Sequence, residues 1–167
     1  MAFLTALAVL VAGDFGSTFF YHVPQHLWFQ LHLRTHHDRR RSYWEHAVLA
    51  TDPAVLLDGL LGALPYLAVA ALLWHVSRTG ALAGLALGQL HVWWRHTGDL
   101  GWRTPAPVRA ALGPLGIVLP EDHAGHHRNP ATEFGDIFRF YDAPARALLA
   151  ALAPTRRRRI APPGVKA

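Results

Sequence analysis

The chain has 167 residues, enough for one domain; 51% are hydrophobic and only 16% are charged. Soluble domains usually carry about 25% charged residues, so we expect lipid to cover part of this surface. The absence of cysteine excludes disulfides and thiolate metal sites. The net charge of +5 suits nucleic acid or an anionic membrane surface. Because the arginines form blocks beside apolar segments, at 34–41 and 156–159, we expect them to face the membrane and expect no nucleic-acid partner.

The first apolar segment runs from Met1 to Tyr21, which is long enough to cross a bilayer. A cleavable signal peptide is the alternative, but no positive residue precedes the run and no clear small-residue cleavage site follows it. Asp14 is costly at that depth, so we expect it to face the protein interior or to lie near the interface.

Two further crossings are expected, at about Val55–His75 and about Ala81–Trp94. Pro53 suits the first helical position of the second crossing, and Pro65 predicts a kink that membrane helices tolerate. The third crossing is rich in Ala and Gly, which favours close helix packing.

Positive charge sets the expected orientation of these crossings. Most of it lies in segments 30–44 and 95–167, which the positive-inside rule places in the cytoplasm. Short helices are expected at Pro107–Leu112 and, on the membrane surface, at Ala143–Leu152. The sequence therefore predicts one all-α integral membrane domain over 1–152, with about three transmembrane helices and a cytoplasmic helical cap. A basic, disordered tail is expected over 153–167.

Histidine is the unusual component, with 12 residues in the chain. Ten of them fall into four short groups, each next to the end of an expected crossing or in the cap. Residues four apart on a helix share a face about 6 Å apart, so such pairs can grip one metal ion. The ten candidate ligands are His22, His26, His32, His36, His37, His91, His96, His123, His126 and His127.

Ten clustered imidazoles cannot all be charged together, and unpaired neutral rings are costly to bury. A metal resolves this because it binds neutral imidazole. Since each ion takes four to six ligands, ten histidines suit two ions better than one. Nitrogen ligands alone suit Zn, Fe, Cu or Ni, and the spacing does not choose among them.

The segments "DFGSTFFYHVPQHLWFQLHLRTHHD" and "PEDHAGHHRNPATEFGDIFRFYD" resemble the histidine boxes of the membrane fatty acid hydroxylase / sterol desaturase superfamily. The similarity extends from about Asp14 to Asp142 and includes Asn129, Phe134–Gly135 and Tyr141–Asp142 after the last box. In one departure, the second box has Leu33 where the family usually has histidine, and His32 precedes it by one residue. His32 can still ligate from the same helical face.

The resemblance implies a diiron enzyme that uses O2 and an external electron donor to hydroxylate or desaturate a C–H bond of a lipid. The substrate class spans acyl chains, sterol-like lipids and carotenoids, and the partners would be a membrane lipid and an electron-transfer protein. It implies a multi-pass protein of a bacterial-type inner membrane, with the boxes and the C-terminus in the cytoplasm. Side chains expected to orient the ligands are Asp38, Glu45, His46, Asp99, Glu121, Asp122 and Asp136.

Two other interpretations remain open at this stage. A non-catalytic metal-binding subunit of a larger membrane complex would keep the same boxes. A metal transporter would place its ligands near the middle of the bilayer, whereas these histidines gather at one face. The sequence therefore favours an oxygenase over a transporter.

Overall fold

The computed structural model describes residues 1–38, 41–48 and 50–160, without the side chains of His46 and of residues 154–160. The described residues form helices joined by turns and loops, with one isolated bridge between Ile117 and Phe138. The α-helices are α1 (Ala2–Gly16), α2 (Leu31–Thr35), α3 (Pro53–Leu72), α4 (Arg78–Arg95), α5 (Ala106–Leu112), α6 (Pro120–Arg128) and α7 (Asp142–Ile160). The π-helical turns are η1 (Ser17–His22), η2 (Gln25–Phe29) and η3 (Trp44–Val48), and the 3₁₀ turns are η4 (His96–Leu100) and η5 (Arg139–Tyr141).

The first apolar helix is longer than the expected Met1–Tyr21. Helix α1 continues through η1 and η2 as one 28-residue apolar helix, Ala2–Phe29. It ends where Gln30 takes a left-handed conformation with φ of 60°. The side chain of Gln25 then accepts a hydrogen bond from the Leu31 backbone N–H at 3.0 Å. Because π turns are frequent at functional sites, the two at the end of this helix mark the region of the first histidines.

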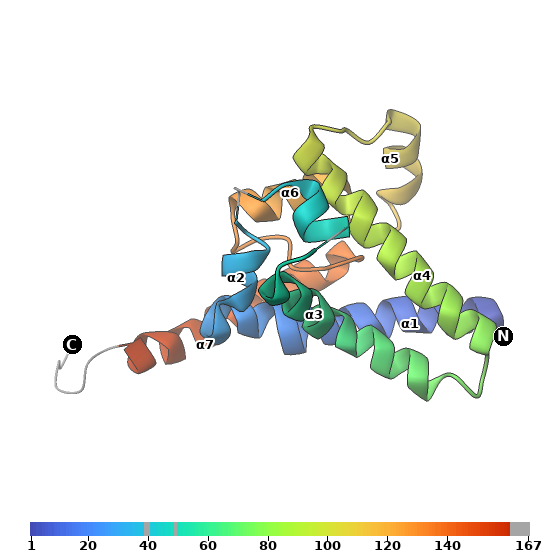
Figure 1. Ribbon diagram of the computed structural model, residues 1–167, viewed down its shortest axis with the longest axis horizontal. Helices are drawn as coiled ribbons and strands as arrows, with labels where there is room; N and C mark the ends of the chain where they lie inside the picture. Colours follow the sequence, from blue (N-terminus) through green and yellow to red (C-terminus); the bar gives the residue numbers. More distant parts are fainter. Residues whose placement is uncertain (39–40, 49, 161–167) are drawn as a thin grey trace.

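Helices α3 and α4 form an antiparallel pair that packs against α1 (Figure 1). Each begins at a side-chain cap: Asp52 accepts from the Ala54 N–H at 2.8 Å, and Ser77 accepts from the Gly80 N–H at 3.1 Å. The turn between them lies beside the N-terminus (Figure 1). The end of α4 and the end of Ala2–Phe29 therefore meet at the opposite end of the bundle.

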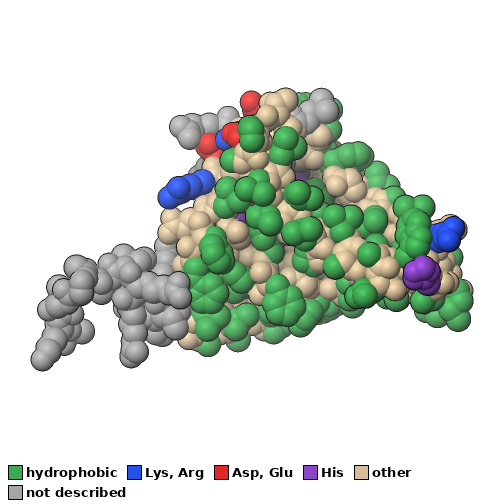
Figure 2. Space-filling model, turned by 60° about the horizontal axis from the view of Figure 1, so that its bottom comes forward, with side chains coloured by type: hydrophobic (Ala, Val, Ile, Leu, Met, Phe, Trp, Pro, Cys, Tyr) green, Lys and Arg blue, Asp and Glu red, His purple; other side chains and the backbone are tan. Residues whose placement is uncertain are grey.

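Two helices of the described chain are long and apolar enough to cross a membrane, Ala2–Phe29 and Pro53–Leu72. Helix α4, the expected third crossing, does not reach that level of hydropathy, so three crossings remain a prediction. Figure 2 shows a broad hydrophobic face, with the charged side chains at its margins. Exposed leucines of α3, among them Leu56, Leu60 and Leu64, contribute to the apolar surface.

Close packing of α1 on α4 depends on small residues. A Cβ on Gly80 would overlap the carbonyl oxygen of Ala2 and lie 2.7 Å from the Cβ of Thr5. Gly80→Ala is therefore expected to lower the free energy of unfolding by about 1–3 kcal/mol, measured by thermal unfolding in detergent. Gly59→Ala is the control: its Cβ would meet nothing within 4 Å, so a gain of about 0.5–1 kcal/mol is expected. Equal stability of the two variants would contradict the α1–α4 packing.

The far end of the bundle carries the short helices. Helix α6 packs on η4 and on the end of α4, and α2 packs on α3. Helix α7 continues to Ile160, although we expected disorder from residue 153. Arginine is a good helix former, so the run at 156–159 can extend the helix. Residues 161–167 of the expected tail lie outside the described part of the chain.

Candidate metal centre

Nine of the ten candidate histidines come together in two adjacent clusters. The first, called here the five-histidine cluster, brings one ring nitrogen from each member within 4.8 Å of every other. Its rings come from the end of Ala2–Phe29, from α2 and the residues after it, and from α6. Its members are His22, His26, His32, His37 and His126.

The second, the four-histidine cluster, meets the same 4.8 Å criterion. It joins the residue after α2, the first residue of η4 and two residues of α6. Its members are His36, His96, His123 and His127. Adjacent histidines thus enter different clusters: His36 and His37 separate, as do His126 and His127. Successive helical side chains point about 100° apart, so one short helix can serve two sites.

Backbone carbonyls fix the protonation of two rings in the five-histidine cluster. The Nδ1 of His22 lies 2.8 Å from the carbonyl oxygen of Phe134, and the Nδ1 of His126 lies 2.5 Å from that of Thr132. A carbonyl oxygen can only accept, so both Nδ1 atoms carry the proton. The two Nε2 atoms, 3.0 Å apart, then present lone pairs to each other when the rings are neutral. This arrangement is repulsive unless a cation lies between them.

The four-histidine cluster shows the same conflict among three rings. The Nε2 atoms of His36, His96 and His123 form a triangle with sides of 3.2, 3.0 and 3.3 Å. A neutral Nε2 either donates or accepts, so at least one side of the triangle must join two like atoms. With metal–nitrogen distances of about 2.1 Å, neighbouring ligand nitrogens lie about 3.0–3.4 Å apart. The triangle therefore fits ligation of one metal ion better than hydrogen bonding.

Other ring nitrogens are buried and lack a partner among the described residues. These are Nε2 of His26, Nε2 of His32 and both ring nitrogens of His37. A buried nitrogen without a hydrogen bond is costly, and a metal ion would relieve that cost. All three rings belong to the five-histidine cluster, so both clusters fit metal ligation.

Asp58 is a site residue that the sequence analysis missed. Its carboxylate lies 3.2 Å from Nδ1 of His32 and also accepts a hydrogen bond from the hydroxyl of Tyr21. This contact fixes the ring of His32 with its Nε2 toward the cluster, as carboxylates commonly do for metal-bound histidines. The available signal was a lone carboxylate within the apolar second crossing.

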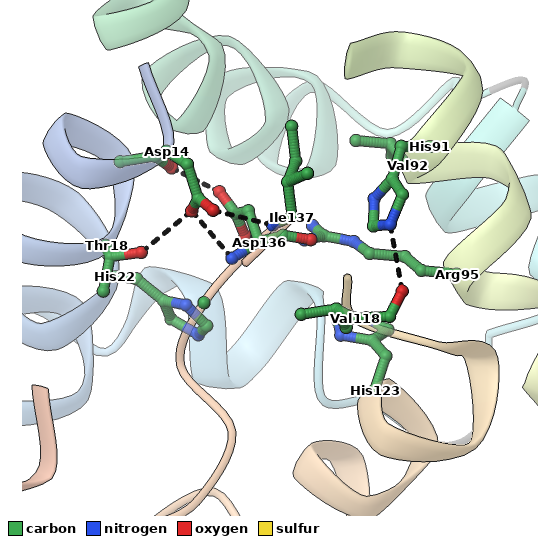
Figure 3. A network of polar contacts seen from close by, with 12 residues as sticks. Asp14, Thr18, His22, His91, Val92, Arg95, Val118, His123, Asp136 and Ile137 are labelled. Carbon is green, nitrogen blue, oxygen red and sulfur yellow. Dashed lines mark hydrogen bonds and ion pairs between the residues drawn. The ribbon is translucent and has the colours of Figure 1, made fainter. Parts of the chain in front are cut away.

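His91 is the one of the ten candidate ligands that lies in neither cluster. Its Nε2 lies 3.0 Å from the carbonyl oxygen of Val118, and it belongs to neither cluster. It precedes His96 by five residues, which turns it about 140° away around α4. Its contact with Val118 anchors the segment before α6 (Figure 3).

Most of the carboxylates expected to orient ligands have other partners. Asp99 is the exception, because its Oδ1 lies 3.6 Å from Nδ1 of His127. The carboxylate of Glu121 accepts hydrogen bonds from the Thr104 N–H and from Arg109. The carboxylate of Asp122 accepts from the Leu119 N–H at the start of α6. Three further candidates are Asp38, which faces Arg41, Glu45, which accepts from the Ser42 N–H, and His46, whose side chain lies outside the described part.

Asp136 acts through a buried polar network rather than on a histidine (Figure 3). Its carboxylate pairs with Arg95 at 2.7 Å and accepts from the hydroxyl of Ser17 at 2.6 Å. Asp14, fully buried, accepts from the backbone N–H groups of Asp136, Ile137 and Phe138 at 2.7–2.9 Å. Helix α1 thereby holds the loop after α6, whose Phe134 carbonyl orients His22.

Burial lowers the pKa of three cluster histidines that lie outside the apolar helices. For His36, His123 and His126 the pKa lies well below the usual value, because burial and neighbouring imidazoles both disfavour the charged ring. These three rings of the folded protein therefore stay neutral at neutral pH, as metal ligation requires.

These pKa shifts predict acid sensitivity of the metal-free protein. Below about pH 6.5 the unfolded chain takes up protons on these rings, whereas His36, His123 and His126 stay neutral in the folded protein. The free energy of unfolding therefore falls as the pH falls below that value. Each ring contributes at most about 1.4 kcal/mol per pH unit. Thermal unfolding in detergent should show a lower midpoint at about pH 5.5 than at about pH 7.5. His75→Gln changes an exposed ring, so its unfolding midpoint should depend on pH as that of the wild type does. A midpoint independent of pH would contradict the burial of these neutral rings.

A cavity of about 770 Å³ opens from the clusters into the space between α3 and α4. Its inner end is formed by His22, His32, His36 and His96, and its walls are mostly leucine, alanine and glycine. Pockets of about 300–1,000 Å³ hold small ligands, and an apolar wall suits an apolar one. The cavity therefore gives a hydrophobic molecule access to the edge of both clusters.

Comparison with known proteins gives one family. The family model described as Fatty acid hydroxylase matches residues 6–145, most of the chain and both histidine clusters. Searches of curated proteins and of solved structures gave no match.

Proposed function

Because the chain belongs to the fatty acid hydroxylase family, an oxidoreductase family of membrane proteins, we propose that it is an O2-dependent membrane oxygenase with two iron ions. It would hydroxylate or desaturate an unactivated C–H bond of a lipid-soluble substrate. The observation that carries the proposal is the pair of histidine clusters at the inner end of an apolar cavity. Bound iron would supply the activation of O2, and an external electron-transfer protein would supply the electrons.

The chain itself contributes ligands in fixed orientations. Nine imidazoles would hold the two ions, five on one and four on the other. Carbonyls of Phe134, Thr132 and Val92 keep protons on the Nδ1 atoms of their histidine partners, so the lone pair for ligation is on each Nε2. The carboxylate of Asp58 does the same for His32. Ligation therefore needs no rearrangement of these rings.

The chain also excludes water and admits substrate. Phe134 is fully buried beside the rings of His22, His26 and His126, so it closes one side of the five-histidine cluster. The cavity between α3 and α4 offers an apolar route from the lipid-facing helices. A C–H bond at its inner end would lie next to His22, His32, His36 and His96.

Metal analysis and product analysis test this proposal together. The purified chain should hold about two iron ions. Cells that express it and receive isotope-labelled O2 should form a lipid that carries the label or has gained a double bond. A variant that lacks both His123 and His126 should form neither product. Bound metal without O2 uptake, in the presence of lipid and a chemical reductant, would instead favour the non-catalytic metal-binding subunit.

A further inference from the structure

Two polar side chains face the apolar cavity without a partner. Gln89 of α4 and Tyr66 of α3 both line it. Neither the amide of Gln89 nor the hydroxyl of Tyr66 makes a hydrogen bond with the described residues, whereas Tyr21, also in the lining, is bound to Asp58. Gln89 is exposed in the cavity and Tyr66 is half-buried. Once lipid or an apolar ligand covers the cavity, an unpaired amide or hydroxyl becomes costly. Their position predicts that a ligand in the cavity supplies the partner.

The two side chains lie at a similar depth. Gln89 precedes the cluster residue His96 by seven positions, which corresponds to about 10 Å along α4. Tyr66 follows Asp58, the partner of His32, by eight positions, which corresponds to about 12 Å along α3. Because α3 and α4 are antiparallel, both groups lie about two to three helical turns from the clusters.

The charges around the cavity favour a neutral ligand group. Two carboxylates line it, those of Asp58 and Asp136. Arg95 is the one Lys or Arg among the described lining residues, and its charge is paired with Asp136 at 2.7 Å. A ligand carboxylate would thus find no uncompensated Lys or Arg there, whereas a hydroxyl or carbonyl can bond to an amide and a phenol.

We propose that Gln89 and Tyr66 recognise a neutral hydrogen-bonding group, a hydroxyl or carbonyl, on the lipid substrate, and thereby fix which carbon reaches the metal centre. This inference rests on the proposed function and adds the substrate class to it. The substrate is a neutral lipid whose polar group lies about 10–12 Å from the carbon that reacts. A free fatty acid ion and a plain hydrocarbon are both poorer ligands.

Binding of three matched probes tests the recognition without turnover. Radiolabelled tetradecanol, tetradecane and tetradecanoate are bound to the purified chain in lipid nanodiscs. The wild-type chain should prefer tetradecanol to tetradecane by roughly 25-fold, about fivefold for each of two neutral hydrogen bonds, and should bind tetradecanoate less well than tetradecanol. Gln89→Met keeps the length of the side chain without the amide and should reduce that preference about fivefold while tetradecane binding stays unchanged.

Two further variants keep the test decisive. Tyr66→Phe removes only the hydroxyl and should weaken the preference for tetradecanol independently, which covers the case that Gln89→Met fails to fold. Leu90→Met is the matched control, because Leu90 neighbours Gln89 but does not line the cavity, and it should leave the preference intact. The proposal is overturned if Gln89→Met and Tyr66→Phe both keep the wild-type preference, or if tetradecanoate binds better than tetradecanol.

This binding test separates the two proposals. An intact preference for tetradecanol in a chain that forms no oxidised lipid would overturn the proposed oxygenase and leave the recognition standing. If products form, the new oxygen or double bond should keep a constant distance from the alcohol group as the alkyl chain is lengthened. Oxidation at a constant distance from the methyl end would overturn the role of Gln89 and Tyr66 and leave the oxygenase standing.

Discussion

Replacement of His123 or His126 by alanine is expected to remove one ion each, and different ions. His123 belongs only to the four-histidine cluster and His126 only to the five-histidine cluster. Each single variant should lose about one metal ion per chain, and the double variant about two. Oxidation of lipid should fall by more than about 100-fold in each single variant, since even side chains that only support metal ligands are worth 10–100-fold. Metal analysis of the purified variants measures the first effect and lipid analysis the second.

His91→Ala is the matched control for these variants. His91 looks like a box residue in the sequence, but its ring contacts the carbonyl of Val118 and joins neither cluster. The variant should keep both ions and lose only a little stability. Loss of an ion from His91→Ala, or loss of the same ion from the His123 and His126 variants, would contradict the two-cluster assignment.

The histidine spacing predicted which rings gather better than it predicted how the two clusters share them. HxxxH and HxxHH groups predicted shared helix faces, and nine of ten histidines do meet. The spacing could not show that His36 and His37 belong to different clusters. That assignment depends on the packing of α2 on α3 and of α6 on α4 and η4. It also could not exclude His91, whose distance from the clusters follows from the rotation of α4.

The same limit applies to the supporting residues. Asp58 lies 26 positions after His32, and only the packing of α2 on α3 brings their side chains together. The carbonyls of Phe134 and Thr132 carry no side-chain signal at all, since every residue has a carbonyl. Sequence distance alone therefore selects acidic residues near the boxes. Most of these carboxylates instead cap the start of a helix or pair with an arginine. The sequence predicts the position of Asp14 more closely. A carboxylate in an apolar helix is costly, so it is expected to face the protein interior, as it does.

Asp14→Ala is expected to destabilise the protein and to empty the five-histidine cluster first. The carboxylate accepts from three backbone N–H groups of the loop after α6, and alanine leaves all three without an acceptor in a buried place. At about 1–3 kcal/mol for each unsatisfied group, the loss is at least about 3 kcal/mol. Release of this loop also releases the Phe134 carbonyl that orients His22. Thermal unfolding and metal analysis of the variant check the two effects.

Thr18→Val separates the role of the loop from a general effect of altering the first helix. Thr18 is fully buried and donates to Asp14 at 3.1 Å, but its side chain makes no hydrogen bond with the described residues of the loop. Its replacement removes one hydrogen bond, so the loss should be about 1 kcal/mol and both ions should remain. Asp14 matters because it ties residues 136–138 to the same helix that carries His22 and His26. An Asp14→Ala variant with wild-type stability and a full complement of metal would show that the loop is held by other contacts.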